Sequence, residues 1–156
     1  MTISIIIPTY NEAENIGKLC THLVAIKTAA VVEIIVVDGG SEDDTLKITS
    51  NYDVLVLRSP EKGRAKQMNY AVTKAKGDIL HFVHADTLPP KGCFDAIWKA
   101  VQEGFPTGRF TSTFDSSSLM LKINAYFTRF DRLWCKGGDQ AIFITKAVFE
   151  QLGGYR

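Results

Sequence analysis

The chain has 156 residues, 46% of them hydrophobic, which is enough for one domain with a real core and short for two. Its 18 Lys and Arg residues against 17 Asp and Glu residues leave a net charge of +1, so the charge balance does not indicate a nucleic-acid partner. No apolar run approaches the ~20 residues of a membrane span, and because the first one starts at Ile3, no signal peptide is expected. Three widely spaced cysteines without a Cys-x-x-Cys pair are typical of reduced thiols, so a soluble cytoplasmic domain is expected.

In chain order, strands are predicted at four apolar runs, residues 3–7, 31–37, 54–57 and 79–83. The first strand is followed by a stripe at helical spacing, formed by Ile16, Leu19, Cys20, Leu23 and Val24. Asn11 with Glu14 is predicted to cap this helix, and Ser41 with Asp44 to cap a short helix that follows the second strand. A further helix is predicted to start after Gly63.

The next predicted helix follows Pro89-Pro90 and is expected to bury Phe94, Ile97, Trp98 and Val101. Residues 109–114 and 141–145 are predicted strands, and residues 119–134 form the clearest amphipathic helix, before a short helix at the end. Strands that alternate with helices are typical of βαβ units, so an α/β fold with a mostly parallel sheet is expected.

Three of the predicted strands end in polar residues able to hold a nucleotide or a metal. The three endings are Pro8-Thr9-Tyr10-Asn11-Glu12, Asp38-Gly39-Gly40-Ser41 and His84-Ala85-Asp86-Thr87. In open α/β sheets, ligands bind beyond the carboxyl ends of parallel strands. Two strand-end aspartates on one such edge therefore predict a site.

Asp86 is the candidate metal ligand at this edge. A carboxylate there can hold Mg²⁺ or Mn²⁺, which would bridge the phosphates of a nucleotide. The imidazole of His84 can also ligate Mn²⁺, although it suits Mg²⁺ less well. The alternative is that Asp86 or Thr87 only caps the following helix and that His84 has a structural role.

The remaining strand ends suit the other parts of a nucleotide. The carboxylate of Asp38 could accept a hydrogen bond from a base or a ribose, with Gly39 allowing close approach, or it could simply hold a tight turn. Tyr10 offers an aromatic face for stacking. Arg64 stands at a predicted helix start, where free N–H groups favour phosphate; the alternative, which the segment taken alone favours, is a solvated basic loop.

These residues resemble the family 2 glycosyltransferases of the GT-A fold. The matches are residues 5–12, 35–41, 63–69 and 77–86, which cover the chain in order and form a specific set even though each is weak alone. His84-Ala85-Asp86-Thr87 together with residues 138–143 resembles one subgroup, the transferase 2 of radical-SAM/selenodomain-associated systems. The resemblance implies a GT-A-type, Rossmann-like three-layer α/β/α sandwich, formed by residues 1–156 as a single domain.

The resemblance also implies a nucleotide-sugar donor, usually a UDP-sugar, and a divalent metal. The donor-binding residues would be Pro8, Thr9, Tyr10, Glu12, Asp38, Gly39, Arg64, Asn69, Ala85 and Asp86. Asp86 takes the place of the last aspartate of the family's Asp-x-Asp motif, and His84 stands where the first aspartate is usual, so both are expected at the metal.

The family's inverting mechanism needs a carboxylate base that deprotonates the acceptor hydroxyl. That base normally follows the Gly-Gly-Tyr/Phe segment, which here is Gly153-Gly154-Tyr155, so the base is expected beyond Arg156 in a domain truncated at its carboxyl end. Asp139 is the one acidic residue of the acceptor-side region that matches a motif, and it is the candidate base within the chain.

Two other functions compete with glycosyl transfer. A nucleotide-sugar-binding fragment without activity would keep the donor half and lack the base. A sugar nucleotidyltransferase would carry a Gly-rich loop after the first strand, which residues 8–12 do not form. The acceptor, a saccharide or a lipid-linked molecule, is not specified. The apolar stripe of the 119–134 helix is expected to pack on the sheet or on a second copy of the chain, with peripheral membrane contact as the alternative.

Overall fold

The computed structural model describes residues 1–110 and 141–156. These residues form a six-stranded sheet in the order β3-β2-β1-β4-β6-β5. The strands are β1 (Ile3–Thr9), β2 (Val31–Asp38), β3 (Leu55–Arg58), β4 (Ile79–Phe82), β5 (Thr107–Arg109) and β6 (Ile142–Thr145). The helices are α1 (Ala13–Ile26), α2 (Thr45–Thr49), α3 (Arg64–Val72), α4 (Cys93–Gln102) and α6 (Lys146–Gln151).

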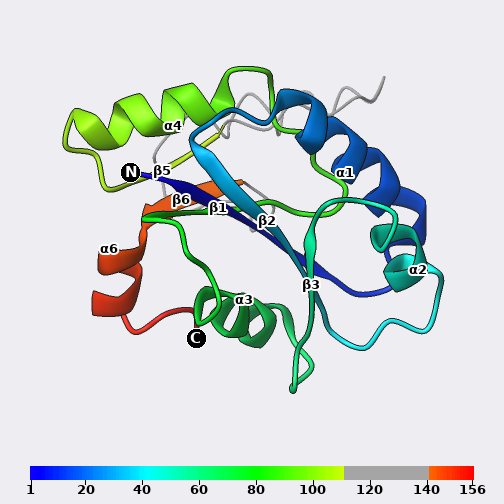
Figure 1. Ribbon diagram of the computed structural model, residues 1–156. Coiled ribbons are helices and arrows are strands. Elements are labelled where there is room, and N and C mark those ends of the chain that lie inside the picture. Colours follow the sequence, from blue (N-terminus) through cyan, green and yellow to red (C-terminus); the bar gives the residue numbers. More distant parts are fainter. Residues whose placement is uncertain (111–140) are drawn as a thin grey trace, which may run out of the picture.

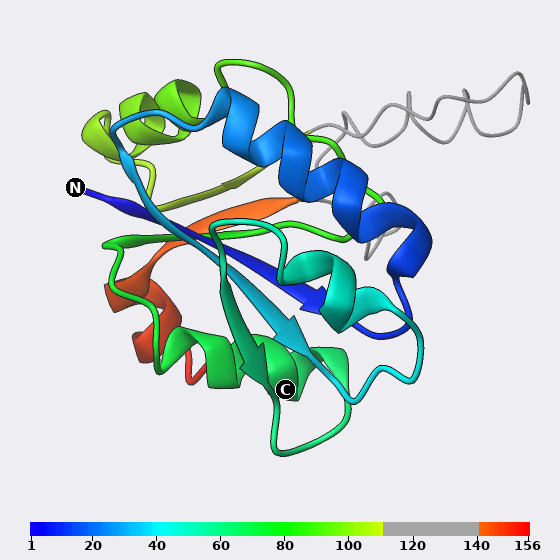
Figure 2. The ribbon, with the colours of Figure 1, turned by 45° about the vertical axis from the view of Figure 1, so that its right-hand side comes forward.

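The sheet is mostly parallel. β1 pairs in parallel with β2 and with β4, and β2 pairs in parallel with β3, whereas β6 is antiparallel to both β4 and β5. Helices α1, α2 and α4 cover one face of the sheet and α3 and α6 the other (Figures 1 and 2). The predicted three-layer α/β/α sandwich is therefore confirmed for the described part of the chain.

Strand β1 lies at the centre of the hydrophobic core, with all 7 of its residues buried. Ile3, Ile5 and Ile7 pack in the cluster with α1 and α4, while Ile6 packs in the cluster with α3 and α6. Successive side chains of a strand point to opposite faces, so a strand covered on both sides is apolar throughout. This double burial is why an almost unbroken apolar run marks β1 in the sequence.

Two side chains that the sequence predicts to be buried are exposed. Val24 of α1 is 48% exposed and Trp98 of α4 is 43% exposed, although Leu23 and Ile97 before them are fully buried. With 3.6 residues per turn, consecutive side chains point about 100° apart around a helix. Each exposed residue therefore lies just past the edge of the buried stripe.

Both predicted capping boxes are wrong. Helix α1 begins after Glu12, and Asn11 lies outside it with a φ of 54° and accepts a hydrogen bond from the backbone N of Glu42 at 2.9 Å. Ser41 donates its hydroxyl to Asp38 instead of capping α2. Both side chains hold the loops against each other, which is a tertiary role that local spacing does not reveal.

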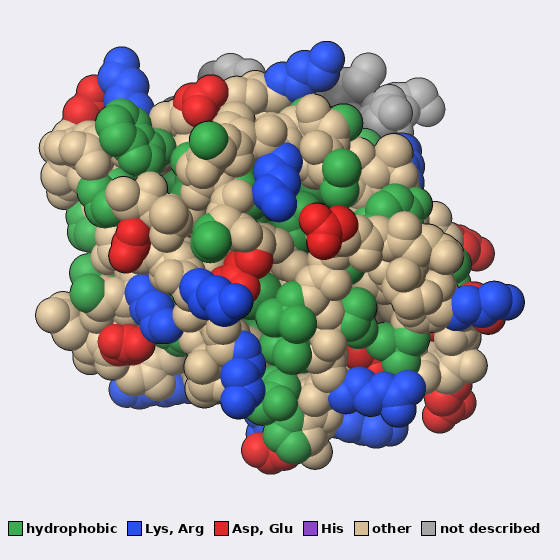
Figure 3. All heavy atoms as spheres, in the orientation of Figure 1, with side chains coloured by type: hydrophobic (Ala, Val, Ile, Leu, Met, Phe, Trp, Pro, Cys, Tyr) green, Lys and Arg blue, Asp and Glu red, His purple; other side chains and the backbone are tan. Residues whose placement is uncertain are grey.

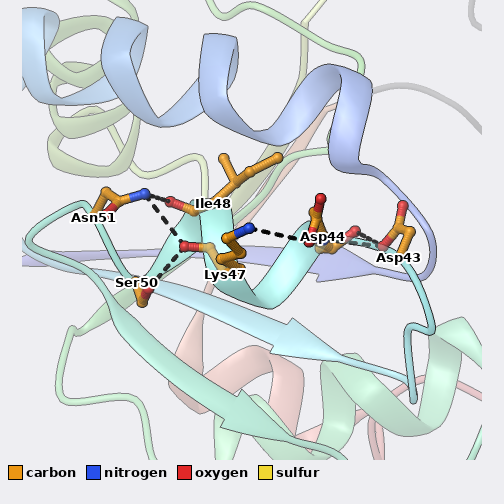
Figure 4. A network of polar contacts seen from close by, with 7 residues as sticks. Asp43, Asp44, Lys47, Ile48, Ser50 and Asn51 are labelled. Carbon is orange, nitrogen blue, oxygen red and sulfur yellow. Dashed lines mark hydrogen bonds and ion pairs between the residues drawn. The ribbon is translucent and has the colours of Figure 1, made fainter.

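Helix α2 is fixed at both ends by polar side chains (Figure 4). Ahead of its first turn, the backbone N of Thr45 donates to Asp43 Oδ1 at 3.0 Å. At its other end, Ser50 Oγ and Asn51 Nδ2 donate to the carbonyl of Lys47 at 2.7 and 3.3 Å. These bonds satisfy backbone groups that the ends of a five-residue helix leave without intrahelical partners.

Several predictions concern residues outside the described ranges: the 119–134 helix, residues 111–114 of a predicted strand, Cys135 and Asp139.

Cys20 and Cys93 are buried free thiols, and burial raises the pKa of each to about 11, so both stay protonated at neutral pH. Among the described residues, no helix is long and apolar enough to cross a membrane. On the face seen in Figure 3, basic and acidic side chains are interspersed with apolar ones.

Candidate functional site

A cleft of about 390 Å³ opens at the carboxyl ends of β1 and β2 and beside the turn after β4. Its walls come from the loop after β1, the turn after β2, the start of α3 and residues 84–86. The cleft collects these residues predicted to bind a donor or a metal: Pro8, Thr9, Tyr10, Glu12, Gly39, Arg64, His84, Ala85 and Asp86. Of the predicted donor-binding residues, only Asp38 and Asn69 lie outside its lining.

Gln67 of α3 joins the ends of β1 and β2 beneath this cleft. Its side chain is 4% exposed, and Nε2 donates to the carbonyl oxygens of Thr9 at 2.7 Å and Val37 at 2.9 Å. A Cβ placed on Gly39 would lie 2.9 Å from Gln67 Cδ, so the side chain leaves room only for glycine there. Gly39, which the sequence predicts to allow close approach of a ligand, thus also makes room for the side-chain amide of Gln67 from α3.

Asp38 holds the turn that follows β2. Its carboxylate is 1% exposed and accepts hydrogen bonds from the backbone N of Gly40 at 2.8 Å and of Ser41 at 3.0 Å, as well as from the Ser41 hydroxyl. These contacts match the tight-turn interpretation of Asp38. They also fix the position of Gly39 at the cleft, so Asp38 shapes the wall from behind.

Tyr10 and Lys62 are exposed residues of the cleft lining. The ring of Tyr10 is 49% exposed, and Lys62 Nζ lies 5.8 Å from its centroid, within the range of a cation–π contact. Next to them, the backbone N of Glu12 is anchored to Thr45 Oγ1 at 2.8 Å, and its carboxylate accepts from Asn15 Nδ2 at 2.9 Å. A half-exposed aromatic ring with a lysine over it suits a planar base that leads to phosphates.

Asp86 does not cap a helix. The residue before α4 is Gly92, whose φ is 80°, and α4 has no side-chain cap. Instead Asp86 is exposed in the turn after β4, where Thr87 Oγ1 donates to its Oδ1 at 3.3 Å. The alternative of a capping role for Asp86 or Thr87 is therefore excluded, and Asp86 is one of the residues that line the cleft.

Arg64 and His84 meet across the cleft wall. Arg64 is the first residue of α3, and its Nη2 lies 2.8 Å from His84 Nδ1. The exposed Lys62 and the start of α3 lie on the same side, so two cations and a helix N-terminus border the cleft there. This combination is typical of a site for phosphate groups.

The residues of the cleft fit a divalent cation shared with a phosphate ligand. Glu12 and Asp86 bring two carboxylates, and the described part of the chain holds no group of three acidic, histidine or cysteine side chains able to enclose an ion. Mg²⁺ is commonly held by one or two carboxylates together with substrate phosphates and water, rather than by an all-protein cage. Asp86 is the residue that would hold the ion, since it is exposed in the turn that lines the cleft and the Thr87 hydroxyl occupies one of its two carboxylate oxygens.

Gln67 lines the cleft although the sequence did not single it out, and Asn69 lies outside the lining. Gln67 lies inside the motif at residues 63–69, but its burial under the strand ends depends on how α3 crosses the sheet. Asn69 lies two residues further along α3, and its amide pairs with the backbone of Tyr155 through two bonds of 2.9 Å. Asn69 thus anchors the segment after α6.

A cleft of this kind, at a parallel strand edge and bordered by a helix N-terminus and a carboxylate, is typical of nucleotide-binding α/β domains. The family model described as glycosyl transferase family 2 matches residues 4–150, so the chain belongs to that family. The predicted family is therefore confirmed.

Curated relatives agree with this family. The chain is 33% identical over 109 residues to a dolichol-phosphate mannosyltransferase of Pyrococcus furiosus, covering 67% of this chain and 31% of the relative. It is 30% identical over 172 residues to a PGL/p-HBAD biosynthesis glycosyltransferase of Mycobacterium tuberculosis, covering 97% of this chain and 62% of the relative. The chain thus spans less than two thirds of the length of either relative.

Solved structures share the fold. The chain superposes on S. aureus TarS in complex with UDP-GlcNAc with a TM-score of 0.72 at 21% identity, covering 99% of this chain and 48% of that one. It superposes on glucosyl-3-phosphoglycerate synthase from Mycobacterium tuberculosis in complex with Mn²⁺, UDP and glucosyl-3-phosphoglycerate with a TM-score of 0.69 at 18% identity, covering 95% and 58%. The predicted GT-A type of fold is confirmed by these matches.

Replacing Gln67 by Leu is expected to lower the free energy of unfolding by about 2 kcal/mol, because two buried hydrogen bonds to the ends of β1 and β2 are lost. Both carbonyls keep a weaker or second partner, the backbone N of Gly39 for Thr9 and the Thr9 hydroxyl for Val37, which limits the loss. Urea denaturation would measure it. Gln151→Leu, at an exposed position near the end of α6, is the matched control and should stay within about 0.5 kcal/mol of the unchanged chain. Equal effects of the two substitutions would contradict the role given to Gln67.

Proposed function

We propose that this chain forms the donor-binding part of an inverting glycosyltransferase that transfers a sugar from a nucleotide-sugar, a UDP-sugar, to an acceptor hydroxyl with the help of Mn²⁺ or Mg²⁺. The observation that carries the proposal is the cleft itself, where an open tyrosine ring, a cationic helix start and the Asp86 carboxylate face one space. Of the similar structures, TarS holds UDP-GlcNAc and the mycobacterial synthase holds UDP with Mn²⁺. These complexes support the choice of uridine nucleotide and of metal.

Each part of the cleft receives a part of the donor in this proposal. Tyr10 stacks on the base, and the rigid turn held by Asp38 places the Gly39 backbone beside the base or the ribose. Arg64 binds the diphosphate from the start of α3, with Lys62 beside it. A divalent ion held by Asp86 would neutralise the charge that develops on the departing nucleoside diphosphate.

The acceptor is proposed to be a saccharide or a lipid-linked molecule, and peripheral contact with a membrane and association of two copies of the chain belong to the same proposal. The name of the P. furiosus relative refers to dolichol phosphate, which supports a lipid-linked acceptor. Membership of the radical-SAM/selenodomain-associated subgroup rests on His84-Ala85-Asp86-Thr87 and residues 138–143. Within the chain, Asp139 stays the candidate base, and otherwise the chain binds the donor without turnover.

The test is thermal unfolding with UDP, GDP and their sugar conjugates, each with and without Mn²⁺. A nucleotide at about a hundred times its dissociation constant adds roughly 2.7 kcal/mol, which raises the midpoint by several degrees for a chain of this size. We expect a Mn²⁺-dependent shift with one nucleotide that Asp86→Asn abolishes, because the amide cannot hold the cation. Asp95→Asn, at an exposed carboxylate on α4, is the matched control and should keep the full shift.

Two outcomes would contradict the proposal. No stabilisation by any nucleotide would remove the donor site. If nucleotide raises the unfolding midpoint equally in Asp86→Asn and in the unchanged chain, the donor site exists but Asp86 does not bind a metal there. A transfer assay over several acceptors then separates an active enzyme from a donor-binding fragment.

A further inference from the structure

The contact between Arg64 and His84 fixes the state of the imidazole. The two side chains come from the start of α3 and the turn after β4, and Arg64 Nη2 lies 2.8 Å from His84 Nδ1. A guanidinium carries only donors, so Nδ1 must accept this hydrogen bond. A ring that accepts at Nδ1 carries its proton on Nε2 and is neutral.

This arrangement leaves the ring no nitrogen for a metal. The lone pair of Nδ1 is directed at Arg64, and Nε2 holds a proton, so ligation through either nitrogen would require the contact to break or the proton to leave. Metal-bound histidine needs a free lone pair on a neutral ring. The contact with Arg64 is therefore incompatible with His84 and Asp86 binding the same ion.

A neutral imidazole also places no negative charge of its own beside Arg64. An aspartate at position 84, as in the Asp-x-Asp pattern, would pair with the guanidinium and offset its positive charge at the cleft. The imidazole instead orients the guanidinium and adds no negative charge. Arg64 is an exposed side chain at the end of a helix, and such a side chain loses much rotamer freedom when it is ordered. A partner that orders it before the ligand arrives removes that cost from binding.

We propose that His84 is a positioning residue for Arg64 and not a metal ligand: its imidazole orients the guanidinium at the cleft for contact with the diphosphate of a nucleotide. This inference rests on the proposed function, since it assigns how the same cleft binds its diphosphate. His84 and Asp86 then have separate roles: His84 positions Arg64, and Asp86 binds the ion.

The experiment measures UDP affinity by calorimetry at saturating Mn²⁺, and the Mn²⁺ concentration needed at fixed UDP, for three substitutions. The Oδ1 of Asn lies close to the position of Nδ1, so His84→Asn keeps an acceptor for Arg64 and removes the imidazole. His84→Gln and His84→Ala lose the acceptor at that place. We expect UDP to bind about tenfold more weakly to the Gln and Ala variants and within about twofold of the unchanged affinity to the Asn variant, with the Mn²⁺ requirement the same in all.

A double-mutant cycle makes the test independent of a general loss of structure. In an Arg64→Ala background, His84→Ala should change UDP affinity by less than about twofold, because the side chain that it positions is gone. Melting midpoints without ligand identify any variant that fails to fold, and the Asn variant then carries the test.

Other results overturn the inference. If the Asn and Ala variants both need much more Mn²⁺, as expected for Asp86→Asn, His84 is a metal ligand. If His84→Ala binds UDP as the unchanged chain does, or weakens binding equally in the Arg64→Ala background, the contact has no positioning role. If the unchanged chain binds no nucleotide at all, the proposed function itself has failed, which is a different result from the other two.

Discussion

Acidification from about pH 7.5 to about pH 4.5 is expected to cost the folded chain about 2.5 kcal/mol through His81 alone. This histidine of β4 has no exposed surface, its ring makes edge-to-face contacts with those of Phe94 and Phe110, and its Nδ1 is 3.3 Å from the carbonyl oxygen of Ile142. Nε2 has no hydrogen-bond partner among the described residues. Desolvation of the charged ring therefore lowers the pKa of His81 from 6.5 to about 4.

The direction of the effect follows from the two pKa values. Between about pH 6.5 and 4 the unfolded chain takes up a proton at His81 that the folded chain does not, so the unfolded state gains stability as the pH falls. Above that window the neutral ring costs the folded state nothing, and the full stability is present. The loss is complete once the pH has dropped below the folded pKa of about 4.

Urea unfolding of the unchanged chain and of His81→Phe over this pH range would isolate the contribution. Phe fits an aromatic site and cannot be protonated, so the variant should lose about 2.5 kcal/mol less than the unchanged chain on acidification. The difference between the two chains removes the contribution of every other titrating group. Parallel pH profiles would show that His81 titrates normally in the folded chain.

The parts of the fold that the sequence predicted correctly are those set by local apolar patterns. β1, β2 and β4 are buried on both faces, so their apolar runs are nearly unbroken and their polar endings stand out. The carboxyl ends of parallel strands must share one edge, and this alone brought Tyr10, Gly39 and Asp86 together in one cleft.

The parts that failed depend on contacts between distant segments. Asn11 and Ser41 carry good capping side chains, yet the loops after β1 and β2 use them to bind each other, through a bond of 2.9 Å from the Asn11 backbone N to Ser41 Oγ. Gln67 and Asn69 are two residues apart on α3, so they point to different neighbours, and only the crossing of α3 over the sheet decides which one reaches the strand ends. The hydrogen bond from Arg64 to His84 joins residues 20 apart and has no local sign in the sequence.

The close approach of Gly77 to β1 also leaves no sign in the sequence. Because of it, adding one methyl group at this position by Gly77→Ala is expected to cause a large loss of stability. The backbone N of Gly77 donates to Ser4 Oγ at 2.8 Å, and the same hydroxyl donates to Glu33 Oε1 at 2.6 Å. A Cβ on Gly77 would lie 2.5 Å from Ser4 N and 2.9 Å from Ile3 C. Both are backbone atoms of β1, which is held between β2 and β4 and cannot move aside.

Gly77→Ala is therefore expected to lower the free energy of unfolding by about 3 kcal/mol, near the upper end for overpacking in a core, and to reduce the urea midpoint by roughly 1.5 M at a slope of about 2 kcal/mol/M. Gly17→Ala in α1 is the matched control. Its Cβ would meet only side-chain atoms, Ile48 Cγ2 at 3.2 Å and Tyr52 Oη at 3.5 Å, and alanine favours the helix by about 1 kcal/mol. The control should thus remain within about 1 kcal/mol of the unchanged chain, because its neighbours can rotate away while the backbone of β1 cannot. Similar midpoints for the two variants would mean that the chain before β4 can shift, and that the start of β1 is less tightly enclosed than its burial indicates.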